Sequence, residues 1–103
     1  MRIAVCQPYR NSAPAQNLDT ALRMLKAAKE AYCADLVCFP EAFPFSYKSK
    51  MGINGDGVKC IRDACVKHGL NAIYGQIIFN EKEGVSNSAV IVGKNGDIMW
   101  RYD

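Results

Sequence analysis

One acidic residue stands where a buried strand should end. Residues 35–43 read Asp-Leu-Val-Cys-Phe-Pro-Glu-Ala-Phe, an apolar run that stops at Pro40 and continues with Glu41. Proline has a fixed φ angle and no backbone N–H, so a sheet ladder ends there. Strand ends carry the reactive groups of many α/β proteins, and Phe39 and Phe43 flank the acid. The pattern therefore predicts a carboxylate at the carboxyl end of a strand, where it can act as a general base.

The chain has five cysteines, and none has the sequence context of a nucleophile. Cys6 and Cys38 fall inside predicted strands, Cys33 at a helix end, and Cys60 and Cys65 within a second helix. A reactive thiol needs an exposed, electropositive setting such as a helix N-terminus. The cysteine spacings also lack the paired CxxC and histidine pattern of a zinc site. We therefore expect small, reduced, packed cysteines and neither a metal ion nor a cofactor.

Two further features favour structural interpretations. Gly52, Gly55 and Gly57 are spaced like a phosphate-binding loop, but they do not directly follow a strand and no Lys-Ser/Thr pair comes after them. Loop flexibility and entry into a helix explain them better. His68 is the sole histidine and lies near a predicted helix end, which favours a structural or surface role.

Composition limits the protein to one domain, because the chain has 103 residues, half of them hydrophobic. The net charge of +3 is mild and its basic residues are dispersed among acids, which does not indicate a nucleic-acid-binding surface. The first residues lack the apolar region of a signal peptide, and the uncharged stretch 69–80 is shorter than the roughly 20 residues that span a bilayer. We expect a cytoplasmic protein with no membrane or nucleic-acid partner.

The remaining pattern alternates strands and helices. We expect strands at residues 3–7, 36–39, 71–79, 87–92 and 98–102, with a tight hairpin at Asn95-Gly96. A first helix should begin at Asn17 as N-cap, and a loop should cover residues 44–56. The first helix should bury one stripe of side chains, namely Leu18, Ala21, Leu22, Leu25, Ala28 and Tyr32.

A second helix should begin near Asp56 and end at Gly69 in the C′ position. Its buried stripe should hold Val58, Ile61, Ala64 and Cys65. This order of elements predicts a layered α/β unit in which both helices lie on the same side of one sheet.

The chain as a whole resembles the start of a carbon–nitrogen hydrolase of the nitrilase/amidase superfamily. The residues that carry the likeness run in order along the sequence: 1–7, Asn17, 34–41, Phe43, Tyr47, Ala64, 69–70, 74–75, 87–89 and Gly96. The resemblance implies an αββα sandwich, of which residues 1–103 form an incomplete N-terminal part. It also implies a small amide, N-carbamoyl or nitrile substrate and a homo-oligomer for the complete protein.

The resemblance further implies a Glu–Lys–Cys catalytic triad. Glu41 matches the general base, and Phe43 and Tyr47 match the two aromatic positions that follow it and are implied to bind substrate. The family's lysine comes just after the segment that residues 101–103 run up to, and its cysteine comes later still. We therefore expect one triad residue of three in this chain, and no activity from the chain alone.

Two positions depart from the family pattern. Cys33 stands where a glycine often ends the first helix, so a left-handed backbone there costs some strain. Ser46 stands where a glycine usually precedes the tyrosine.

Two alternatives also remain open: a truncated, non-catalytic remnant or interaction module of the same fold, and an unrelated α/β binding domain.

The sandwich that the resemblance implies has a consequence for stability. One sheet face, which we expect to carry Val5, Val37, Ile73 and Ile91, lacks a covering sheet in residues 1–103. We therefore expect the chain alone to be aggregated, partly unfolded or dependent on a partner.

Overall fold

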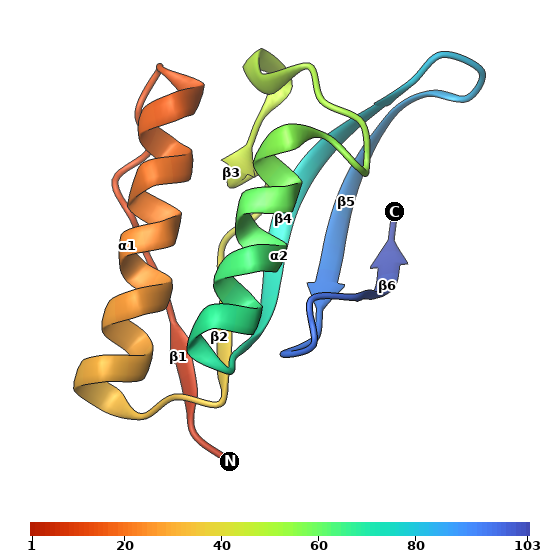
Figure 1. The fold of residues 1–103 in the computed structure, drawn as a ribbon. Coiled ribbons are helices and arrows are strands. Elements are labelled where there is room, and N and C mark those ends of the chain that lie inside the picture. The colour runs from red at the N-terminus through yellow and green to blue at the C-terminus, as the bar shows by residue number, and fades with distance from the viewer.

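The computed structural model describes residues 1–103 and shows one sheet with two helices on a single face (Figure 1). The helices are α1 (Pro14–Tyr32) and α2 (Asp56–His68), which lie side by side. The strands are β1 (Ile3–Val5), β2 (Leu36–Cys38), β3 (Pro44–Phe45), β4 (Asn71–Asn80), β5 (Gly84–Val92) and β6 (Ile98–Tyr102). The predicted α/β architecture, with both helices on the same side, is confirmed.

The sheet is mixed, and its order is β1-β2-β4-β5-β6 with β3 paired to β4. β1, β2 and β4 run parallel because a helix connects each strand to the next strand in the sheet. β5 and β6 return antiparallel through hairpins, and the second hairpin turns at Gly96, whose φ is +87°. The expected hairpin at Asn95-Gly96 is therefore confirmed.

The first helix begins earlier than the sequence predicts. Its N-cap is Ala13 and Pro14 occupies the first turn, where a fixed φ and a missing N–H cost nothing. Asn17 lies inside the helix, and its side chain is buried. Its Oδ1 accepts from the Asn11 N–H at 2.7 Å and its Nδ2 donates to the Asn11 carbonyl at 2.8 Å. The predicted N-cap is thus wrong, and Asn17 instead fastens the β1–α1 loop to the helix.

Both helices end in left-handed backbone, as expected. Cys33 has φ +51° and Gly69 has φ +64°, and the N–H of each returns to carbonyls of the last helical turn. Tyr32, predicted to belong to the buried stripe of α1, is exposed because the helix ends there. The second helix begins at Asp56 with Gly55 as N-cap.

The predicted loop 44–56 holds more structure than expected. Pro44 and Phe45 form β3, which pairs with Gly75 and Gln76 of β4. A 3-10 turn, Tyr47–Ser49, follows and begins at Ser46, whose Oγ accepts from the Lys48 N–H at 3.3 Å. Ser46, the departure from the family pattern, therefore caps this turn.

The core lies between the helices and the face of the sheet that they cover. Its members come from both helices and from the sheet, and the largest fully buried ones include Tyr74, Phe43, Phe45, Leu25, Ile61, Leu70, Ile78, Val37, Val58, Val90 and Val92. The face assignment expected for Val37 is wrong, since this side chain is fully buried under the helices and aligns with Ala72.

Neither helix is both long and apolar enough to cross a membrane.

The opposite face of the sheet has no covering layer in these residues (Figure 1). The strand register places Val5, Cys38, Ile73, Ile91 and Trp100 on it. Val5 is 75% exposed and Trp100 66% exposed, so this face is apolar and open to solvent. We call it the open face.

Candidate active site

Glu41 lies just beyond the carboxyl end of β2, in the short loop that leads to β3. The sequence prediction of its place in the fold is therefore confirmed. Arg10, from the loop after β1, holds this segment: Nη2 donates to the Glu41 carbonyl at 2.6 Å and Nη1 to the Ala42 carbonyl at 3.0 Å. Ala42 has φ +51°, a left-handed conformation that the two bonds help to maintain.

A glycine on β4 lets this loop approach the sheet closely. A Cβ atom at Gly75 would lie 2.3 Å from the Ala42 nitrogen and 2.6 Å from the Pro40 carbonyl oxygen, both backbone atoms. The Gly75 N–H also donates to the Phe43 carbonyl at 2.8 Å. β4 runs without a break through Gly75. Because Gly75 has no side chain, the backbone of the loop that carries Glu41 can pack directly against β4.

The Glu41 carboxylate has one side-chain partner. Asn87, in the middle of β5, donates its Nδ2–H to Glu41 Oε1. Asn87 shares its face of the sheet with Ala89 and Ile91, so the pair belongs to the open face. The other carboxylate oxygen, Oε2, has no hydrogen-bond partner in the protein.

Two cavities meet at this pair, and Glu41 and Asn87 line both of them. The smaller has a volume of about 310 Å³ and is lined by residues 39–41, by residues of β4 and β5, and by Tyr102 and Asp103. The larger, of about 570 Å³, is lined by the β1–α1 loop and the segment after Glu41, including Arg10, Tyr47 and Lys48. Glu41 is therefore accessible from two cavities.

The two aromatic residues implied to bind substrate have different positions. Tyr47 is 64% exposed and lines the larger cavity with Glu41. Phe43 is fully buried, lines neither cavity, and packs against Phe39 with ring centroids 5.9 Å apart. The structure therefore brings Tyr47 to the same cavity as Glu41, whereas Phe43 supports the loop from the core.

None of the cysteines is placed to be activated by Glu41. No cysteine lines either cavity. Burial raises the pKa of Cys65 to about 11 and raises the pKa of Cys6 and of Cys38, the reverse of what a thiolate nucleophile requires. No group of three or more His, Cys, Asp or Glu side chains is arranged to hold a metal ion.

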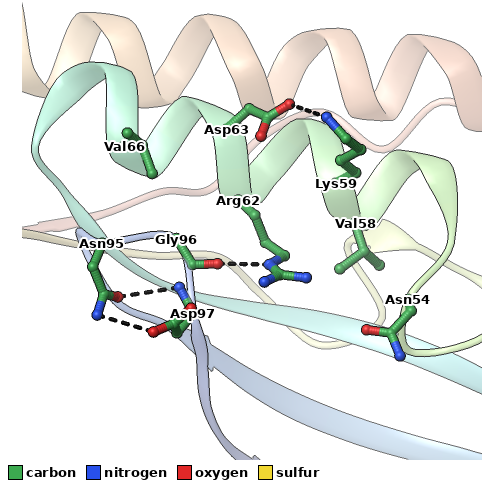
Figure 2. A pocket seen from close by; sticks show the side chains of 9 residues that line it. All are labelled: Asn54, Val58, Lys59, Arg62, Asp63, Val66, Asn95, Gly96 and Asp97. Atoms are coloured by element: carbon green, nitrogen blue, oxygen red, sulfur yellow. Dashed lines mark hydrogen bonds and ion pairs between the residues drawn. The ribbon is translucent and has the colours of Figure 1, made fainter.

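A separate cavity of about 340 Å³ lies between α2 and the β5–β6 turn (Figure 2). Its charged side chains already have partners: Arg62 Nε donates to the Gly96 carbonyl at 2.6 Å, and Lys59 pairs with Asp63 at 2.8 Å. Asp97 accepts from Asn95 Nδ2 at 3.1 Å. The Arg62–Gly96 bond fastens the hairpin to α2, whereas the other two contacts lie within the helix and within the turn, so we assign this cavity a structural role.

Two residues of the candidate site were not identified as functional from the sequence. Asn87 contributes to the family resemblance, but it lies 46 positions from Glu41, and only the β4–β5 register brings the two together. Arg10 carries no local signal, because its contacts to the Glu41 loop depend on the parallel pairing of β1 with β2.

A family model described as carbon-nitrogen hydrolase matches residues 2–103. No curated protein sequence gives a significant match. Among solved structures, a carbon-nitrogen hydrolase from Helicobacter pylori G27 superimposes with a TM-score of 0.82 at 19% identity, over 97% of this chain and 38% of that chain. An amidase from Nesterenkonia sp. gives a TM-score of 0.77 at 23% identity, over 100% of this chain and 42% of that chain.

A variant of an N-terminal amidase gives a TM-score of 0.77 at 18% identity, covering 97% of this chain and 26% of that chain. The chain therefore spans well under half the length of these solved structures. At these identities the superpositions show the fold, and the match to the family model is independent of them.

Proposed function

Since the chain belongs to the carbon-nitrogen hydrolase family, we propose that residues 1–103 supply the general base of a site that cleaves a non-peptide C–N bond. The lysine and the cysteine of the triad come, in this proposal, from sequence beyond Asp103. The observation that carries the proposal is the Glu41 carboxylate, bonded to Asn87 through one oxygen and open to two cavities through the other.

In this proposal, cleavage of an amide requires a cysteine and a lysine in addition to the general base. An amide carbon is a poor electrophile, so attack at neutral pH requires a thiolate. Glu41 accepts the thiol proton while sulfur bonds to the carbon, and it passes that proton to the nitrogen, which leaves as the C–N bond breaks. Glu41 then takes a proton from water as the water oxygen bonds to the carbon; the C–S bond breaks, the proton returns to sulfur and the acid is released. A lysine ammonium stabilises the negative charge on the substrate oxygen during both steps.

The geometry supports this role for Glu41 in two ways. Arg10 and the close approach at Gly75 hold the backbone of the loop, so the carboxylate is positioned before substrate binds. Asn87 engages Oε1 and leaves Oε2 available for proton transfer. Tyr47 is our candidate to contact the substrate in the larger cavity, with Phe43 supporting the loop from beneath.

We propose a small amide, an N-carbamoyl compound or a nitrile as the substrate, in that order. Amides come first because solved structures of the Nesterenkonia sp. amidase include a complex with butyramide and one with covalent addition of the acetamide moiety of fluoroacetamide at the active site cysteine. The complete protein is proposed to be a homo-oligomer.

The test uses the complete protein that contains these residues. Glu41→Gln keeps the shape of the side chain and its contact with Asn87 but removes the base, so ammonia release from acetamide and butyramide should fall by roughly 10²–10⁴-fold. Glu30→Gln, an exposed glutamate on α1, is the matched control and should retain activity. Full activity of the Glu41→Gln protein, with circular dichroism unchanged, contradicts the proposal.

A further inference from the structure

The lining of the larger cavity carries more positive than negative side chains. Apart from Glu41, its only charged lining residues are Arg10 and Lys48, both cationic, and the remaining residues include Asn11, Ser12 and Tyr47. A cavity that takes only neutral amides has no need of two cations beside the carboxylate that must accept a proton.

Neither cation has an anionic partner in the protein. The ion pairs of the structure are Arg23–Asp19, Lys59–Asp63 and Arg101–Asp103, all away from this cavity. Arg10 donates to two carbonyl oxygens of the Glu41 loop, which fix the guanidinium in place without neutralising it. Both positive charges therefore remain available to a ligand.

The two cations come from different segments that are each held locally. Arg10 is fastened to the Glu41 loop, and Lys48 lies in the 3-10 turn that Ser46 caps. The Arg10 guanidinium has further N–H groups beyond the two that bind the loop carbonyls, and the Lys48 ammonium adds a compact charge. The Arg10 guanidinium and the Lys48 backbone are thus held by local contacts, and both residues are exposed to solvent.

The charged side chains that line the smaller cavity are both acidic. Its charged lining residues are Glu41 and Asp103, and Asp103 is paired with Arg101 through Nε at 2.7 Å. Bonds from Arg101 and Ser88 lower the pKa of Asp103. A ligand with a negative charge is therefore favoured on the Arg10 side of Glu41 and disfavoured on the Asp103 side.

We infer that the complete enzyme acts on amides that also carry a carboxylate, with the scissile amide at Glu41 and the carboxylate held by Arg10 and Lys48. This inference rests on the proposed function and adds the substrate class. Because a charged hydrogen bond in a partly exposed site contributes about one decade in affinity, each cation should contribute about tenfold to kcat/KM.

The experiment compares succinamate with succinamide, two amides of nearly the same size that differ by one negative charge. The complete protein should hydrolyse succinamate with a kcat/KM at least tenfold higher. Lys48→Gln should lower kcat/KM for succinamate by about tenfold and leave succinamide unchanged, and Lys48→Arg should restore most of the loss. Lys50→Gln, two positions away and outside the cavity lining, should change neither value.

The outcomes separate this inference from the proposed function. Equal kcat/KM for the two substrates, or a Lys48→Gln protein with an unchanged ratio, overturns the charge preference while leaving amide hydrolysis intact. No hydrolysis of succinamate, succinamide, acetamide or butyramide by the folded complete protein overturns both. Raised ionic strength provides a second readout, because it should weaken the reaction of succinamate and leave that of succinamide unaffected.

Discussion

The two faces of the sheet differ sharply in how far their side chains are buried. The face under α1 and α2 is a finished core, in which Val37, Tyr74 and Val90 are fully buried. The open face uses the alternate residues of the same strands, yet Val5 and Trp100 there are mostly exposed. Strand geometry sends neighbouring residues to opposite sides, so one set of strands can build one complete layer and one incomplete layer.

The candidate active site lies on the incomplete side. Asn87 shares its face with Ala89 and Ile91, and its partner Glu41 lies at the edge of that face beside two open cavities. The covered face contributes none of the side chains that we propose to act in the reaction. It contributes rigidity, because the core holds Phe43 and through it the loop that carries Glu41. In our proposal, stability and chemistry are thus divided between the two faces.

The strongest test of this comparison is the behaviour of residues 1–103 alone. Burial of apolar surface stabilises by roughly 25 cal/mol per Å², so several hundred Å² left in water on the open face forfeits on the order of 10 kcal/mol. That is comparable to the whole net stability of a domain. We expect the isolated chain to be aggregated or partly unfolded, and inactive on amides, as measured by sedimentation velocity, thermal denaturation and ammonia release.

Substitutions can locate the cause on the open face. Val5→Lys combined with Trp100→Lys should raise the monomer fraction of the isolated chain. Val66→Lys, on the exposed side of α2, is the control and should not raise it. A monomeric wild-type chain with a cooperative melt above about 50 °C contradicts the prediction.

The second test concerns the covered face. Ile61 of α2 is fully buried in the core, and Ile61→Ala should lower the free energy of unfolding of the complete protein by about 2–5 kcal/mol through lost burial and a new cavity. Val66→Ala, five residues along the same helix and 54% exposed, should change it by less than about 0.5 kcal/mol. Urea denaturation measures both. Similar losses for the two variants refute the assignment of faces.

The sequence predicted what depends on local pattern. The proline after β2 placed Glu41, the glycine after α2 marked the end of that helix, and Asn95-Gly96 marked the second hairpin. These signals are local because each one sets the backbone angles of a few adjacent residues.

The errors came from interactions that the local pattern does not contain. Val37 was assigned to the wrong face because β2 has three residues, too few for alternation to choose a side. Asn17 has the type of an N-cap, but its amide pairs with Asn11 in a loop that the sequence did not define. Arg10 meets Glu41 only through strand pairing, which no nearby residue encodes.

The smallest expected effect lies on neither face, at the exposed start of β2. The Arg2 backbone N–H donates to Asp35 Oδ2 at 2.7 Å. This bond, with weaker help from the N-terminal amine, Lys29 and the Arg2 side chain, lowers the pKa of Asp35 below its ordinary value of 3.8. Because the pKa is lower in the folded state, the stabilisation is present above about pH 4 and is lost as pH falls through the folded value.

Asp35→Asn should therefore destabilise the complete protein slightly at pH 7, and the difference from wild type should shrink toward zero at lower pH. Chemical denaturation at pH 7, 4 and 3, with an NMR titration of the Asp35 carboxyl, measures both quantities. Arg2→Ala keeps the backbone donor, so it should retain the larger part of the pKa shift. A loss at pH 7 as large as that of Ile61→Ala would mean that exposed polar contacts at the strand ends rival the covered face, which the burial of the two regions argues against.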